Sequence, residues 1–168
     1  MVEALQEPLP RTLIDQLGTA DKPRVLVMGG GGIAPGGVTA TLSIVRGLLE
    51  RWMQPLGLVG SWEWVQNAWK KWGVIDFEKI EPGSIDAIMH HGGTCLGPGR
   101  GMLKRDEFIN MRRLQHEIGF IGTAVVGWDG TLSGSQALQY SLGEDMRPVA
   151  DTVACIKTID GDAEGSIA

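Results

Sequence analysis

Three short segments of the chain hold glycines and carboxylates of the kinds that suit phosphate chemistry. In the first, four consecutive glycines occupy residues 29–32, directly after the apolar run 25–28. A strand that ends in a glycine-rich turn before a helix brings backbone N–H groups and the positive end of the helix close to anionic oxygens. The pattern predicts either phosphate binding through Gly31 and Gly32 or a tight strand-to-helix turn without a ligand.

The second segment places a carboxylate in another glycine-containing turn. Asp129 precedes Gly130 and closely follows the apolar run 120–126. A carboxylate at the end of a strand can hold Mg²⁺ directly or through its waters, and it can equally serve as the N-cap of the following helix. Beside it, the backbone amides of Gly130, Thr131 and Gly134 would line bound phosphate groups.

The third segment holds two carboxylates, Asp160 and Asp162, two positions apart. In a loop these groups would repel one another, which raises the proton affinity of one of them and favours a nearby cation. Two solvated loop acids are the alternative interpretation. The spacing alone leaves both interpretations open.

The order of these segments and one further motif is typical of a single enzyme family. The segments are GGGGIAPGGVTA at 29–40, GGTCLGPGR at 92–100, VVGWDGTLSGS at 125–135 and IKTIDGD at 156–162. This order resembles the 6-phosphofructokinase family, which has a GGDAPG-like turn, a GGT-x-LG-x-x-R segment, a GGDGT/S phosphate loop and a PKTIDND loop at similar separations. The resemblance reaches only the N-terminal half of a typical family member.

The resemblance implies roles for the residues of the last two motifs. Asp160 would take the proton from the sugar hydroxyl as the general base, and Thr158 and Asp162 stand in matching positions on either side of it. Asp129 would be the magnesium-associated carboxylate. Lys157 would neutralise phosphate as a point charge.

Two arginines and a tryptophan complete the implied nucleotide site. Arg100 and Arg105 match family arginines that contact the transferring and nucleotide phosphates, and a planar guanidinium can meet two phosphate oxygens at once. Trp62 stands near the place of a tyrosine that contacts adenine in many relatives, and it is equally placed to be a core residue at helical spacing. The implied ligands are ATP, Mg²⁺ and fructose 6-phosphate.

The sequence departs from the family pattern at several positions. Trp128 replaces the second glycine of the GGDG turn, where a bulky side chain could obstruct or reshape nucleotide binding. Ile33 replaces the aspartate of GGDAPG, while Ile156 and Gly161 replace the proline and asparagine of PKTIDND. The family's C-terminal, substrate-binding half has no counterpart in the sequence, so we expect its sugar-phosphate contacts to be missing from this chain.

The implied activity is ATP-dependent phosphoryl transfer to the 1-hydroxyl of fructose 6-phosphate, in glycolysis. Gly130, where pyrophosphate-using relatives tend to have a second aspartate, favours ATP as the donor. Two alternatives stay open: a pyrophosphate-dependent phosphofructokinase, and a truncated or diverged nucleotide-binding homologue or partner subunit without catalysis. Diacylglycerol and NAD kinases rank below these, because they lack the TIDND and GGT-x-LG segments. A homo-oligomer or a complex with a complementary half is the expected assembly.

Composition limits the partners and the compartment. The 168 residues are 43% hydrophobic, and a chain of this length can remove about 70% of its unfolded surface from water. The net charge of −5 argues against a nucleic-acid partner, and the lack of a long apolar run argues against a membrane span. Residues 1–20 lack a signal-peptide pattern, so we expect a cytoplasmic protein. Cys95 and Cys155 have no metal-type spacing, and we assign them no chemistry.

Apolar patterns predict alternating strands and helices. Runs at 25–28, 56–59 and 120–126 are typical of buried strands, and apolar stripes at helical spacing over 38–52 and 108–118 predict helices. Short connections between these elements indicate a three-layer α/β domain with a mostly parallel sheet and helices on both faces. Ligands of such sheets gather at the carboxyl ends of the strands.

The domain assignment follows from the same patterns. We expect an N-terminal extension over residues 1–23, with a short helix near Thr12, and a phosphofructokinase-like domain over residues 24–168. Tryptophans at helical spacing predict a further helix over 62–72. Residues 84–91 suit a strand by composition or a helix with Ser84 as its N-cap, and the family resemblance favours the helix.

Overall fold

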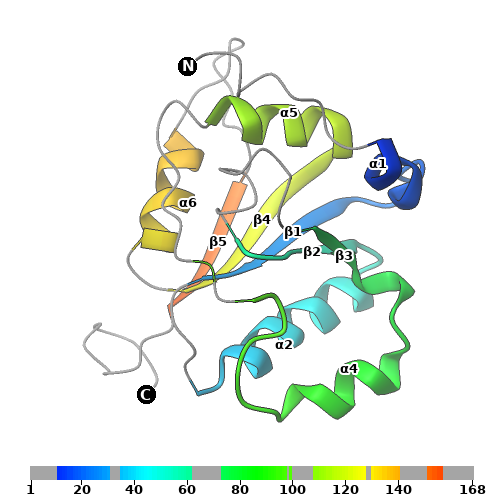
Figure 1. Cartoon of the computed structure of the whole chain (residues 1–168), viewed down its shortest axis with the longest axis vertical. Helices are drawn as coiled ribbons and strands as arrows, with labels where there is room; N and C mark the ends of the chain where they lie inside the picture. Colours follow the sequence, from blue (N-terminus) through cyan, green and yellow to red (C-terminus); the bar gives the residue numbers. More distant parts are fainter. Residues whose placement is uncertain are drawn as a thin grey trace.

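The computed structural model describes residues 11–30, 35–61, 73–97, 99, 108–127, 130–140 and 151–156. These residues form a five-stranded sheet in the spatial order β3-β2-β1-β4-β5 (Figure 1). The strands are β1 (Arg24–Gly29), β2 (Gln54–Leu58), β3 (Val74–Asp76), β4 (Phe120–Gly127) and β5 (Asp151–Ile156). Only β3 runs antiparallel to its neighbour, so the expected mostly parallel sheet is confirmed.

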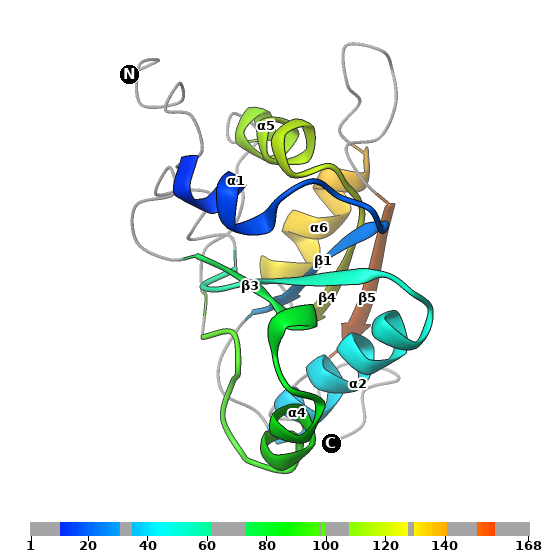
Figure 2. The same ribbon diagram turned by 90° about the vertical axis from the view of Figure 1, so that its right-hand side faces the viewer.

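Helices cover both faces of this sheet. One face carries α1 (Arg11–Leu17), α5 (Phe108–Ile118) and α6 (Gly130–Tyr140), and the other carries α2 (Gly37–Glu50) and α4 (Pro82–Met89) (Figures 1 and 2). A short 3₁₀ helix, η2 (Phe77–Lys79), follows β3. The expected three-layer α/β architecture is therefore confirmed.

The alternation of side chains along β1 divides the core into two layers. Leu26 and Met28 lie in the layer with α1 and α5, whereas Val27 lies in the layer with α2 and α4. All three side chains are completely buried. A parallel strand covered on both faces is apolar at consecutive positions, which is the physical reason for the uninterrupted run 25–28.

Three elements differ from the sequence-based expectations or were missed. The segment after η2 is the helix α4, but it begins at Pro82 with Glu81 at the N-cap, so the assignment of Ser84 as the cap was wrong. Proline suits the first helical turn because its missing N–H group needs no partner there. The short strand β3 was not predicted, and no bounds were predicted for the exposed strand β5. The helix expected over 62–72 lies outside the described residues.

The expected N-terminal extension contributes to the same core as the sheet. Its predicted short helix is α1, whose Leu13 and Leu17 are buried in the layer beneath α5. The boundary at residue 23 remains a prediction.

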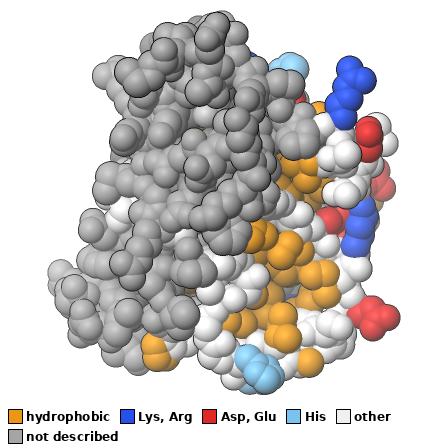
Figure 3. Space-filling view, in the orientation of Figure 1, with side chains coloured by type: hydrophobic (Ala, Val, Ile, Leu, Met, Phe, Trp, Pro, Cys, Tyr) orange, Lys and Arg blue, Asp and Glu red, His pale blue; other side chains and the backbone are white. Residues whose placement is uncertain are grey.

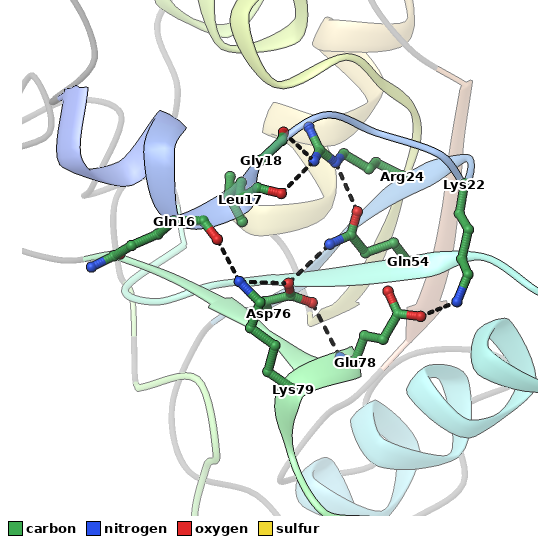
Figure 4. A network of polar contacts seen from close by, with 9 residues as sticks. All are labelled: Gln16, Leu17, Gly18, Lys22, Arg24, Gln54, Asp76, Glu78 and Lys79. Carbon is green, nitrogen blue, oxygen red and sulfur yellow. Dashed lines mark hydrogen bonds and ion pairs between the residues drawn. The ribbon is translucent and has the colours of Figure 1, made fainter.

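A buried arginine joins the amino-terminal ends of the parallel strands to two helix ends. Arg24, which is 4% exposed, donates from Nε to Gln54 Oε1 at 2.8 Å and from Nη1 to the Ile118 carbonyl at 2.7 Å (Figure 4). Its Nη2 donates to the carbonyls of Leu17 and Gly18 at 2.8 and 2.9 Å. Since Leu17 and Ile118 end α1 and α5, one guanidinium satisfies carbonyls that helix ends leave without helical partners.

The same network continues to the edge strand β3. Gln54 Nε2 donates to Asp76 Oδ2 at 2.9 Å, and Asp76 Oδ1 accepts from the Glu78 N–H at 3.1 Å (Figure 4). Lys79 Nζ lies 3.6 Å from Asp76 Oδ2, and Lys22 pairs with the Glu78 carboxylate. These contacts anchor the only antiparallel strand among the described residues to the amino edge of the sheet.

Candidate functional site

The glycine turn after β1 meets the start of α6 at the carboxyl edge of the sheet. Gly29 is aligned with Val126 on the neighbouring strand β4. The Gly30 N–H donates to the Val126 carbonyl at 2.9 Å, and a Cβ on Gly30 would fall 1.9 Å from Thr131 Oγ1. Only glycine permits this approach, so Gly30 allows a close contact between the end of β1 and the first turn of α6.

Helix α6 directs its N-terminus to this same edge. It begins at Gly130, three residues after β4 ends at Gly127, and the first turn of a helix points its N–H groups along the helix axis. A Cβ on Gly127 would lie 3.1 Å from Thr131 Cβ and 3.3 Å from the Gly30 carbonyl oxygen. Gly30 after β1 and the N-terminus of α6 thus lie side by side at this edge, and a helix N-terminus suits an anionic ligand.

A second close backbone contact forms at the end of β2. The Ser61 N–H donates to the Leu58 carbonyl at 3.3 Å across a turn in which Gly60 has φ 78°. The Gly60 N–H donates to the Leu96 carbonyl at 2.8 Å, and a Cβ on Gly99 would fall 2.4 Å from the Gly60 carbonyl oxygen. The described part of the GGTCLGPGR segment therefore contacts the turn at the carboxyl end of β2.

The fourth motif starts at the same edge. Ile156, the last residue of β5, is aligned with Gly127 at the end of β4. The described parts of all four motifs consequently lie at the carboxyl ends of four adjacent parallel strands. This is the edge at which open parallel sheets bind ligands.

The structure describes three of the predicted site residues, and they occupy different positions in α6. Gly130 and Thr131 are the first two residues of the helix, whereas Gly134 is the fifth. In a regular α-helix the N–H of the fifth residue donates to the carbonyl of the first residue. This bond within the helix would compete with the proposed contact between the Gly134 amide and a phosphate, and that contact remains a prediction. The other candidates lie outside the described residues, and their roles remain predictions: Gly31, Gly32, Trp62, Arg100, Arg105, Asp129, Lys157, Thr158, Asp160 and Asp162.

The described residues hold no ready-made metal centre. No group of three or more His, Cys, Asp or Glu side chains among them is arranged to hold a metal ion. The charged side chains visible in Figure 3 lie mainly along the margin of the face drawn there, around apolar side chains.

No described helix combines the length and apolarity needed to cross a membrane.

Two residues at this edge were missed by the sequence analysis. Gly30 could not be told apart from its three glycine neighbours, because only its contact with Thr131 distinguishes it. Ser61 follows a turn glycine and carries no recognisable motif. The structure singles it out by its burial and its φ of 52°.

Comparisons with known proteins agree with these motifs. Residues 24–167 match the family described as Phosphofructokinase. The chain is similar to the ATP-dependent 6-phosphofructokinase of Listeria welshimeri, with 28% identity over 151 residues, which is 85% of this chain and 41% of that protein. The ATP-dependent 6-phosphofructokinase of Halalkalibacterium halodurans is 29% identical over 149 residues, with the same two coverages. The chain thus spans about two-fifths of the length of the curated relatives it matches.

Solved structures support the fold. The phosphofructokinase from Saccharomyces cerevisiae is similar with a TM-score of 0.68 at 20% identity, covering 88% of this chain and 21% of that chain. The Pichia pastoris phosphofructokinase in the T-state has a TM-score of 0.66 at 16% identity, covering 88% of this chain and 16% of that chain.

Proposed function

Because the chain belongs to the phosphofructokinase family, we propose that it binds ATP at the carboxyl edge of its sheet for phosphoryl transfer to the 1-hydroxyl of fructose 6-phosphate. The observation that carries the proposal is the contact between Gly30 and Thr131, which brings the end of β1 against the N-terminus of α6. Phosphoryl transfer depends mainly on positioning and charge stabilisation. Backbone amides beside a helix N-terminus can contribute to both.

The phosphates of ATP would bind between the glycine turn and α6. Gly31 and Gly32 would present backbone amides from one side, and Gly130 and Thr131 from the other. Mg²⁺, when bound, would offset the negative charge of the phosphates, and Asp129 is the residue proposed to hold it. Its carboxylate is the hard oxygen ligand that Mg²⁺ prefers, and the nearest described residues before and after it, Gly127 and Gly130, both lie at this edge.

The acceptor side would be formed by the segment that follows β5. Asp160 is proposed to take the proton from the 1-hydroxyl, with Thr158 and Asp162 beside it. The alignment of Ile156 with Gly127 supports this proposal, because it starts the segment at the phosphate edge. Lys157, Arg100 and Arg105 would supply positive charge to the phosphates, and Trp62 would contact the adenine.

ATP is the proposed donor in preference to pyrophosphate. Gly130 would leave space beside the phosphates, whereas a second carboxylate there would repel or crowd the α-phosphate of a nucleotide. Glycolysis is the implied pathway, and the cytoplasm is the implied location.

A nucleotide-binding subunit without independent catalysis is the second candidate. The observation in its favour is Trp128, which stands in the phosphate turn where the family pattern has a glycine and which favours altered nucleotide binding. In such a subunit, contacts to the sugar phosphate would come from a complementary polypeptide or from further copies in an oligomer.

One experiment tests both candidates with a polypeptide of these 168 residues. Calorimetry measures binding of ATP with Mg²⁺, and a coupled assay measures fructose 6-phosphate phosphorylation with ATP and with pyrophosphate in parallel. We expect ATP binding with little or no turnover, because loss of even one strong transition-state charge contact costs about a hundredfold or more in rate. Turnover on addition of a complementary polypeptide would support a divided enzyme. A complete lack of ATP binding would contradict the proposed function.

In a preparation that turns over, two carboxylate variants separate the proposed roles. Asp160→Asn should lower the rate by roughly 10²- to 10⁴-fold while ATP affinity changes much less, since a general base acts on the acceptor. Asp129→Asn should instead weaken the dependence on Mg²⁺. Asp162→Asn is the matched control. If Asp162→Asn abolished activity while Asp160→Asn retained activity, the general-base role would belong to Asp162 instead of Asp160.

A further inference from the structure

One side-chain hydrogen bond joins the first turn of α2 to the last turn of α4. Thr39, the third residue of α2, donates from Oγ1 to the Met89 carbonyl at 2.7 Å. Met89 is the last residue of α4, and the carbonyls of a last helical turn have no partner within their helix. The bond therefore satisfies a helix end, and it connects two residues that lie 50 positions apart in the sequence.

This bond links two of the four motifs. Thr39 belongs to the glycine motif at 29–40, and α4 leads into the GGTCLGPGR segment at 92–100. The end of α4 lies beside the start of α2, and from there the chain runs back toward the sheet (Figures 1 and 2). Because α2 begins just after the glycine turn that follows β1, the bond lies on the carboxyl-edge side of the molecule.

Few described contacts fix the chain between this bond and the sheet. Residues 90–92 are exposed, and a Cβ on Gly92 or Gly93 would meet no described atom within 4 Å. The chain is next buried at Leu96, whose carbonyl accepts the Gly60 N–H at 2.8 Å. The residues between α4 and Leu96 are therefore positioned mainly from their two ends.

We propose that Thr39 is a positioning residue for the ATP site, because its hydrogen bond to Met89 sets the place of the GGTCLGPGR segment relative to α2. This inference rests on the proposed function, in which Arg100 of that segment supplies positive charge to the phosphates. Loss of the bond releases the end of the segment that adjoins α4. A nucleotide then has to order the segment as it binds, at a cost in affinity.

Two substitutions of Thr39 separate the hydrogen bond from the shape of the side chain. Thr39→Val removes the donor and keeps the branched shape, whereas Thr39→Ser keeps the donor. Calorimetry with ATP and Mg²⁺ should show Thr39→Val weakened by roughly 3- to 10-fold, the value of one neutral hydrogen bond, and Thr39→Ser close to the unchanged chain. Without ligand, amide hydrogen exchange in residues 90–97 should be faster in Thr39→Val than in the unchanged chain.

Thr41→Val is the matched control on the same helix. Thr41 Oγ1 donates to the Gly37 carbonyl at 2.8 Å, so this change removes a threonine hydrogen bond within α2 and keeps the link to α4. It should leave ATP affinity and the exchange of residues 90–97 unchanged.

The outcomes separate this inference from the proposed function. Unchanged ATP affinity in Thr39→Val would overturn the inference and leave the proposed function standing. Equal losses in Thr39→Val and Thr41→Val would show a general effect on α2 and would also overturn the inference, as would a loss of affinity without faster exchange in residues 90–97. If the unchanged chain bound no ATP at all, the inference and the proposed function would fall together.

Discussion

The two edges of the sheet are held together in opposite ways. At the amino edge, long side chains form the connected network of Arg24, Gln54 and Asp76, in which one guanidinium makes four hydrogen bonds. At the carboxyl edge, glycines allow close approaches instead: Gly30 lies against the Thr131 side chain at the start of α6, and Gly99 lies against the backbone at the end of β2.

This difference has a physical reason. Side chains that pair with one another satisfy the polar groups of the amino edge and leave little to offer a ligand. Glycine has no side chain, so a ligand can approach its backbone closely, and backbone amides near a helix N-terminus suit an anion. We therefore expect changes at the amino edge to alter stability and changes at the carboxyl edge to alter ligand binding.

The largest expected effect is on stability at the amino edge. Arg24→Met would leave the carbonyls of Leu17, Gly18 and Ile118 without the hydrogen bonds that Arg24 donates. Because Leu17 and Ile118 are buried, we expect the free energy of unfolding to fall by about 3 kcal/mol. Chemical denaturation measures the fall. ATP affinity of the remaining folded protein should be unchanged.

Arg46→Met is the control for this change. Arg46 is exposed and lies 3.4 Å from Asp86 in a surface ion pair, so its removal should cost less than about 1 kcal/mol. If both arginine variants had equal effects, the network of Arg24 would not be what holds the amino edge.

An intermediate effect on stability, with a larger one on binding, is expected at the carboxyl edge. Gly30→Ala places a methyl group 1.9 Å from Thr131 Oγ1 and should push α6 away from the glycine turn. Overpacking of this kind costs about 1–3 kcal/mol, and we expect calorimetry to show loss of ATP binding as well.

Gly29→Ala is the matched control, because a Cβ there would have nothing within 4 Å. It should preserve ATP binding. Adding Thr131→Gly to Gly30→Ala should recover part of the lost stability, since it removes the group that clashes. Normal ATP binding by Gly30→Ala would show that the close contact is not needed for the site.

The smallest effect concerns the reactivity of two cysteines. Cys155 on β5 is exposed, whereas partial burial raises the pKa of the Cys95 thiol and keeps it protonated at neutral pH. Since the thiolate is the reactive form, alkylation at pH 7.5 should label Cys155 several-fold faster than Cys95. Mass spectrometry of the two peptides measures the rates, with Cys155→Ser as the control. Faster labelling of Cys95 would show that the Leu96 segment opens readily.

The sequence by itself determined the family and the general architecture. The motifs are local, so their glycines and carboxylates identify the phosphofructokinase pattern without a structure. The apolar runs at 25–28 and 120–126 also determine buried parallel strands, because a strand covered on both faces needs consecutive apolar residues.

Tertiary structure alone decided the features that depend on distant partners. The short strand β3 pairs through its backbone with β2. Arg24 donates hydrogen bonds to the ends of α1 and α5, which lie far apart in the sequence. Strand β5 is held by β4 and α6, although most of its side chains are exposed and give no burial pattern. The contact of Gly30 with Thr131 and the burial of Ser61 depend on segments that are distant in the sequence and adjacent in the fold. A local pattern of residues therefore cannot predict either feature.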